Sequence, residues 1–135
     1  MNIQESLQQI LASKQIFGAQ FYETFFARCP EVQEFFKDVN IERQAVLLTM
    51  ALVVIEKQYS CPFTAAEEYL KYLGTKHHDW KIPKSRYADW TAAMIETLGQ
   101  FHGSDWDESL EQQWRDAIAH VIEFMFQGYE QHYTV

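Results

Sequence analysis

Apolar side chains recur every three or four positions along almost the whole of this chain. Around its middle, Ala66, Leu70, Leu73 and His77 follow one another at helical spacing, and Trp80 comes next. No run of four or more β-branched and aromatic residues alternates with the period of two that a half-buried strand requires. The sequence therefore predicts an all-α fold with about seven helices of unequal length, joined by short connections.

Local signals predict where several of these helices begin and end. The residue before a proline avoids the α region, so one helix should end at Cys29, and Pro30 should open a short helix that reaches Phe36. Asn40 is a good N-cap for a long helix from Ile41 to about Tyr59. We expect this helix to run through the core, with an inward face formed by Gln44, Leu47 or Leu48, Ala51 or Leu52, and Ile55.

The helix that carries the central stretch should begin at the segment Thr64-Ala65-Ala66-Glu67, which has the spacing of a capping box. It should end soon after His77, where Pro83 follows. We expect a further helix from Pro83 or Ser85 to about Gly99–Gly103. A last helix should open at the acidic segment 105–108, where negative charge is favourable at a helix start.

Length and charge limit what the chain can be. The 135 residues fit one domain, which we expect to span 1–135. The net charge of −8 disfavours a nucleic acid or an anionic membrane as a partner. Cys29 and Cys61 lack the spacing of a zinc site, and neither a signal peptide nor a membrane-spanning run is visible. The expected location is the cytoplasm, with both thiols reduced.

Three polar residues fall within apolar stripes, and they point to a binding site. His77 continues an inward stripe, whereas His78 lies roughly 100° further round the helix. An inward imidazole is either a hydrogen-bonded core histidine or a metal ligand. Tyr22 and Gln44 are the other two polar residues, and ten Phe, seven Tyr and four Trp need a large core or a flat apolar ligand to cover them. An imidazole, a phenol and an amide among aromatics suit a planar cofactor whose metal takes the imidazole.

Several motifs, taken in their order and spacing, resemble a known family. They are Phe21-Tyr22 followed by Phe26, Pro30-Glu31 and Phe36; Gln44 with Leu48 one turn on; Leu73-Gly74-x-x-His77 with Ile82 and Tyr87; and Trp106 before Trp114. From about Phe17 to Tyr129 the chain resembles the bacterial single-domain globins and the globin half of flavohaemoglobins. The resemblance implies a globin fold, with helices packed around a haem pocket and haem b as the cofactor.

The resemblance also implies roles for individual residues. His77 would be the proximal ligand of the haem iron, and Phe36 would pack on the porphyrin. Tyr22 and Gln44 would donate hydrogen bonds to the bound gas, and Leu48 would narrow the space above the iron. The remaining residues expected at the haem are Leu73, Lys76, Ile82, Tyr87 and Trp90.

Plainer interpretations of the polar residues stay open at this point. Tyr22 could be an ordinary core tyrosine, and Gln44 a solvated residue near a helix start. A register shifted by one residue would put Arg43 in place of Gln44. Lys76 could pair with a haem propionate or simply be solvated.

One departure from the flavohaemoglobin pattern concerns the proximal side. There a tyrosine and a glutamate near the proximal histidine strengthen its donor character. Tyr87 matches the tyrosine, but the position of the glutamate falls near Gln131, with Glu130 beside it. The departure argues against a strong anionic push, and so against peroxidase-like or efficient dioxygenase chemistry.

The expected function is reversible binding of O₂, and also of NO or CO, for storage, delivery, sensing or scavenging. NO dioxygenation would need a reductase acting in trans, because the chain ends at Val135 with no flavin or nicotinamide motif. We therefore do not expect a dedicated enzyme. The alternative is a globin-shaped helical module that works by protein contact, without a functional haem. The sequence leaves the oligomeric state open.

Overall fold

The computed structural model describes residues 1–132, and the last three residues of the expected domain lie outside this range. Within it the chain forms six α-helices and two 3₁₀ helices and no strand, so the all-α prediction is confirmed. The elements are α1 (Ile3–Ala12), α2 (Lys14–Arg28), η1 (Pro30–Phe36), α3 (Ile41–Ser60), α4 (Thr64–Asp79), α5 (Arg86–His102), η2 (Gly103–Asp105) and α6 (Glu108–Gln131).

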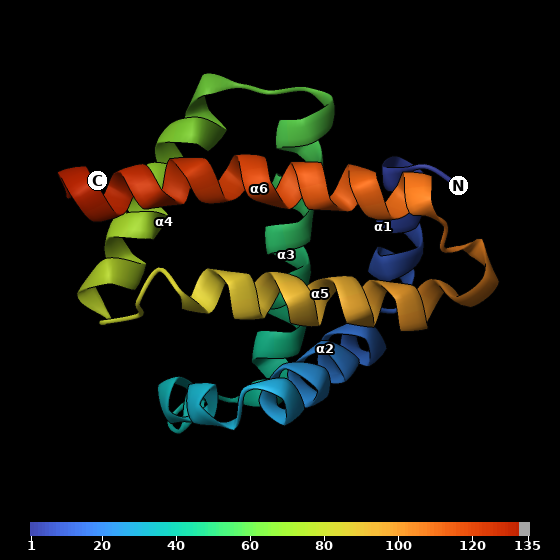
Figure 1. Cartoon of the computed structure of the whole chain (residues 1–135), viewed down its shortest axis with the longest axis horizontal. Coiled ribbons are helices and arrows are strands. Elements are labelled where there is room, and N and C mark those ends of the chain that lie inside the picture. Colours follow the sequence, from blue (N-terminus) through green and yellow to red (C-terminus); the bar gives the residue numbers. More distant parts are fainter. Residues whose placement is uncertain (133–135) are drawn as a thin grey trace.

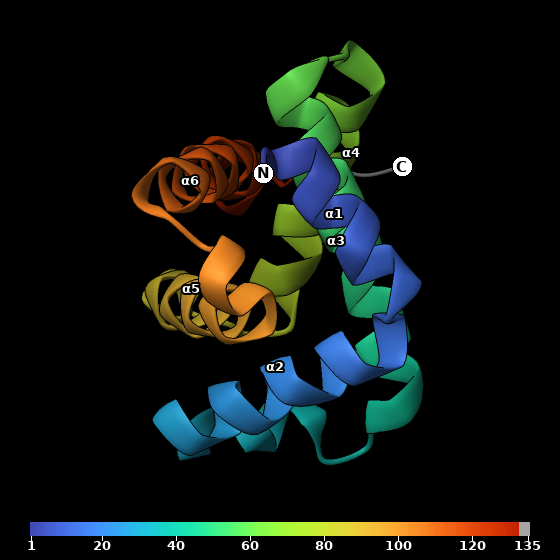
Figure 2. The same cartoon turned by 90° about the vertical axis from the view of Figure 1, so that its right-hand side faces the viewer.

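The helices cross one another in two groups. α5 and α6 run alongside each other; α6 passes across α3 and α4, and α5 passes across α3 (Figure 1). Turned by 90°, the molecule shows α5 and α6 on one side and α1, α3 and α4 on the other, with α2 at one end (Figure 2). α4 packs extensively on α6 but makes few contacts with α3, although the short connector 61–63 joins the two helices. The sides of α3 and α4 that face each other are therefore largely not in mutual contact.

Glycines allow two close helix crossings. A Cβ at Gly18 of α2 would overlap the backbone carbonyl of Ala45 in α3. At the other crossing, a Cβ at Gly74 of α4 would overlap the carbonyl of Met125 in α6, and one at Gly128 would overlap the carbonyl of Lys71. Since only glycine lets two backbones approach this closely, these positions fix how α2 meets α3 and how α4 meets α6.

Of the two predicted helix caps, at Asn40 and at Thr64, one is present in the structure. The Asn40 side chain accepts a hydrogen bond from the Arg43 backbone N–H at 3.1 Å, as predicted. The capping box at Thr64 is wrong, because Phe63 is the N-cap and Thr64 is already helical. The Glu67 carboxylate instead accepts from the buried amide of Gln58, 3.3 Å away. A contact with the end of α3 has therefore replaced the local cap.

The structure decides which residue of each apolar pair on α3 faces the core. Leu48 and Leu52 are buried, but Leu47 is 48% exposed and Ala51 is also exposed. α3 has close neighbours in α1, α2 and α6, and neighbouring residues lie about 100° apart on a helix, so only one of each pair can face them. α4 ends at Asp79, soon after His77 as predicted, so Trp80, which comes next in the spacing, lies beyond the helix and is exposed.

A polar cluster lies within the core where α1, α5 and α6 meet. The Trp114 indole N–H donates to the Ser6 hydroxyl oxygen at 3.0 Å, and that hydroxyl lies 2.6 Å from Nε2 of His102. The indole can only donate, so the Ser6 hydroxyl is free to donate to Nε2. Burial lowers the pKa of His102. His102 is thus a core histidine whose Nε2 is hydrogen-bonded, while its buried Nδ1 has no partner among the described residues.

No helix in the described part of the chain combines the length and the apolar character needed to cross a membrane.

Candidate functional site

Tyr22 and Gln44 meet beside the α2–α3 crossing. The Gln44 side-chain N–H donates to the Tyr22 hydroxyl oxygen at 3.2 Å. Gly18 lies one turn before Tyr22, and Ala45 follows Gln44, so the close helix approach brings the two side chains together. Burial raises the pKa of Tyr22, which keeps the phenol protonated. Since its oxygen accepts from Gln44, its own O–H hydrogen remains available for another acceptor.

The structure distinguishes Gln44 from Arg43 as the partner of Tyr22. Arg43 is exposed, and Gln44 is the residue that contacts Tyr22. Phe36 of η1 meets the Tyr22 ring edge-on, with a centroid distance of 5.4 Å. Leu48, one turn after Gln44, is buried. Tyr22, Phe36 and Gln44 therefore form one connected group.

His77 lies near the end of α4 and is held by its own helix. Its Nδ1 lies 2.8 Å from the Leu73 carbonyl oxygen, so Nδ1 carries the hydrogen and donates it. Burial lowers the pKa of His77, and the bond to Leu73 offsets part of this effect. The imidazole is therefore neutral, with an unprotonated Nε2, which is the form that ligates a metal. His77 is half-buried and His78 is exposed, as the helical phase predicts.

A second connected group surrounds His77. Tyr87 of α5 lies 6.1 Å from it between ring centroids. The backbone N–H of Ile82 donates to the His77 carbonyl at 3.1 Å, and the Tyr129 hydroxyl donates to the Ile82 carbonyl at 2.6 Å. These bonds connect the segment after α4 to both α4 and α6.

Tyr87 packs against aromatic rings on α6. Its ring meets those of Phe126 at 4.9 Å and Tyr129 at 5.8 Å between centroids. Its buried hydroxyl finds no hydrogen-bond partner among the described residues, and burial raises its pKa. Glu130 pairs instead with Lys84 at 3.3 Å on the exposed end of α6. On α6, Tyr87 therefore contacts the aromatic rings of Phe126 and Tyr129.

α5 connects the two groups. Tyr87 reaches His77, and Trp90, three residues further on, packs on Phe21 at 5.6 Å between centroids. Phe21 in turn meets Tyr22 edge-on at 5.1 Å. Lys76 lies with its ammonium 5.6 Å from the centre of the Tyr72 ring on its own helix.

Residues 19–125 match the family model of the globins. The chain is a globin. Members of this family bind haem and, through it, diatomic gases. The comparison with curated proteins gives no match.

The residues present fit a haem. Neutral His77, with Nδ1 committed to Leu73 and Nε2 free, is a suitable axial ligand of iron. Apolar surface is also left uncovered on the two helices that carry His77 and Gln44. Leu47, three residues after Gln44, is 48% exposed, and Tyr69, eight before His77, is 52% exposed. A flat apolar cofactor lying against these helices would cover such surface.

Sequence reasoning missed two features that position the site. The glycine crossings are invisible to periodicity, because a helical glycine could as well mark a weak helix. The Leu73 carbonyl that orients His77 is a backbone group, so no side-chain pattern indicates it. The spacing Leu73-Gly74-x-x-His77 contains both features.

Proposed function

We propose that this globin binds O₂ reversibly on the iron of haem b, and that it is a single-domain globin similar to the globin half of flavohaemoglobins. NO and CO, which share the size of O₂, are further ligands. The observation that supports the proposal best is the bond from Gln44 to Tyr22. Because Gln44 donates to the Tyr22 oxygen, the Tyr22 O–H hydrogen stays available for a bound ligand.

When bound, the haem would supply an iron that His77 holds and that binds the gas. His77 holds the cofactor through Nε2, and the Leu73 carbonyl fixes the ring orientation and the tautomer. Tyr22 would donate its free O–H hydrogen to the bound gas. Gln44 orients Tyr22, and Leu48 and Phe36 exclude water from the polar pair.

The surroundings of Tyr87 favour gas binding over NO dioxygenation. Phe126 and Tyr129 pack against it, and neither carries a carboxylate that could strengthen the basicity of His77. A dioxygenase cycle would also need a reductase. We therefore place reversible binding first.

The test begins with the visible absorption spectrum of the purified chain after addition of haem. A Soret band is expected. Its absence would contradict the proposal and favour the alternative of a helical interaction module without a functional haem.

The role of Tyr22 is then tested by the O₂ dissociation rate. Tyr22→Phe removes one donor to a charged acceptor, so the rate should rise about 10- to 100-fold. Tyr72→Phe, which changes a half-buried tyrosine next to Lys76, is the matched control and should leave the rate unchanged. A rate that Tyr22→Phe does not alter would remove the gas-binding role from Tyr22.

A further inference from the structure

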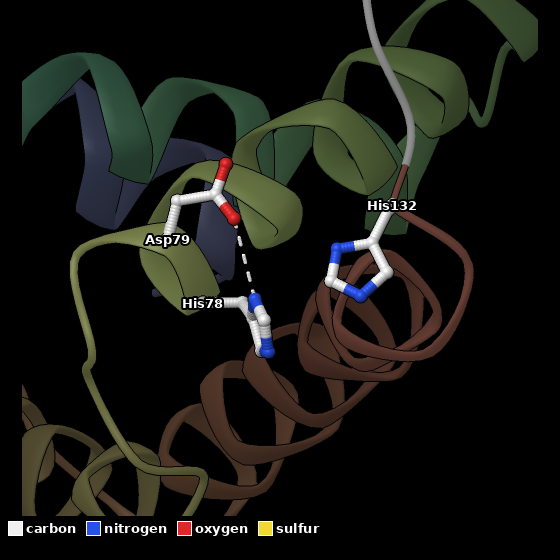
Figure 3. A group of neighbouring side chains, drawn as sticks. All are labelled: His78, Asp79 and His132. Carbon is white, nitrogen blue, oxygen red and sulfur yellow. Dashed lines mark hydrogen bonds and ion pairs between the residues drawn. The ribbon is translucent and has the colours of Figure 1, made fainter.

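Three side chains with metal-ligating atoms lie together at the ends of α4 and α6. His78 and Asp79 belong to the last turn of α4, and His132 directly follows α6 (Figure 3). One ligand atom from each lies within 4.8 Å of the other two. The two imidazole rings are 4.6 Å apart between centroids, and His78 Nδ1 is 3.3 Å from the Asp79 carboxylate. All three residues are exposed, so an ion in solution can reach them.

The close α4–α6 crossing explains why these residues meet. Gly74 and Gly128 mark the crossing, and His78 and His132 each follow their glycine by four residues, or about one helical turn. The Tyr129 ring also meets His78 edge-on at 5.5 Å between centroids. The position of His78 relative to α6 is therefore fixed by backbone packing.

The end of α6 directs His132 toward this point. His132 is the C-cap and adopts the left-handed conformation, with φ of 52° and ψ of 62°, while its N–H donates to the Gly128 carbonyl. Histidine is one of the residues that adopt this conformation more readily than most. The chain thus leaves the helix here, and the imidazole lies beside His78 (Figure 3).

We propose that His78, Asp79 and His132 bind a divalent transition ion of the Zn²⁺ or Cu²⁺ class. Two imidazoles and a carboxylate suit these ions, whereas Mg²⁺ and Ca²⁺ prefer an all-oxygen set. With bonds of 2.0–2.1 Å, ligand atoms around a tetrahedral ion lie roughly 3.4 Å apart, so only small side-chain rotations are needed from the present spacing. Water completes the coordination on the exposed side.

The bound ion joins the end of α4 to the end of α6, next to the residue that we assign as the proximal haem ligand. Zinc should therefore stabilise the packing that positions His77, and it binds the folded chain better than the unfolded one. This site does not rest on the proposed gas-binding function, because none of its three ligands belongs to the haem site.

The test is calorimetric titration of the haem-loaded chain, residues 1–135, with ZnCl₂. The wild type should bind one equivalent, and its melting temperature should rise by several degrees in excess zinc. His78→Ala and His132→Ala should each weaken binding by more than about tenfold, since even outer-shell changes cost that much. His120→Ala removes a half-buried histidine elsewhere on α6 and is the matched control, with binding unchanged.

Equal zinc affinity in the wild type and in the His78 and His132 variants would overturn the proposal. A second readout is the paramagnetic resonance spectrum with one equivalent of Cu²⁺. Coupling to two imidazole nitrogens is expected in the wild type, and to one in either histidine variant; the same coupling in all three would also overturn the proposal. Zinc titration of His77→Ala, which should not retain haem, separates the two proposals because the ion site should survive.

Discussion

The two sides of the candidate haem site are built differently, although each begins with a glycine crossing. On the α2–α3 side, Tyr22 and Gln44 hold each other through a side-chain hydrogen bond. On the α4–α6 side, His77 is held by the backbone of its own helix, and the buried hydroxyl of nearby Tyr87 has no partner among residues 1–132. The first side relies on mutual side-chain contacts, and the second on backbone geometry.

This difference indicates how each side responds to change. A side-chain pair can be altered one member at a time, so substitutions on the α2–α3 side should alter ligand kinetics with modest effects on stability. A backbone-held imidazole depends on its helix, so changes in the α4–α6 packing should reduce stability and cofactor binding together. The following predictions test this division.

The largest effect is expected from Gly74→Ala. The new Cβ would overlap the Met125 carbonyl, and a backbone group cannot move aside cheaply. The free energy of unfolding should fall by about 3 kcal/mol, and haem should dissociate faster because His77 lies one turn away. Chemical denaturation and haem transfer to an acceptor globin measure the two effects.

Gly103→Ala is the control for Gly74→Ala. Gly103 has a φ of 58°, but an added Cβ meets no atom within 4 Å. Its cost should be about 1 kcal/mol, from the backbone conformation alone. Equal costs at the two glycines would show that the close α4–α6 crossing does not govern stability.

A smaller loss of stability is expected on acidification, from the core cluster of Ser6, His102 and Trp114. This cluster belongs to neither side of the candidate haem site. The pKa of His102 is lowered in the folded chain, so the unfolded chain binds a proton first as the pH falls below about 6.5. The stability from this group is present above that pH and is lost as the pH falls toward the lower folded pKa, by at most about 1.4 kcal/mol per pH unit.

His102→Gln checks this assignment because it removes the titrating group and keeps a hydrogen-bonding side chain toward Ser6. The variant should lose less stability than the wild type between pH 7 and pH 5, as followed by thermal melting at each pH. If the wild type and His102→Gln lost the same stability over this pH range, the acid sensitivity would come from other groups.

The smallest effects come from two tyrosines and should have opposite signs. Tyr22→Phe removes a hydrogen bond with Gln44 and should lower the free energy of unfolding by about 1 kcal/mol. Tyr87→Phe removes a buried hydroxyl without a partner and should raise it by up to about 1 kcal/mol. Urea denaturation of both variants gives the comparison, and two losses of the same size would erase the distinction between the sides.

Much of the fold follows from local patterns. Periodicity gave the helices, the Cys29-Pro30 step marks the end of α2, and Asn40 caps α3 as expected. The capping box at Thr64 failed because a buried side chain from another helix, Gln58, took the Glu67 carboxylate. Such competition depends on tertiary neighbours, which a local motif does not contain.

The site divides in a similar way. Helical phase separates His77 from His78, and the family resemblance pairs Tyr22 with Gln44, which the structure brings within hydrogen-bond distance. The approach of His132 to His78 could not be predicted, because it depends on a crossing of two helices more than 50 residues apart in the chain. Periodicity could not decide which residue of the pairs Leu47/Leu48 and Ala51/Leu52 faces inward, because it shows that a face is apolar but does not reveal what covers it.

The central claim is that His77, held by Leu73, is the residue that binds haem. The most direct measurement is the Soret absorbance of His77→Ala and His78→Ala after addition of one equivalent of haem, with circular dichroism to confirm folding. His77→Ala should lose the band that the wild type shows, and His78→Ala should keep it. A band retained in His77→Ala, or lost only in His78→Ala, would contradict this account.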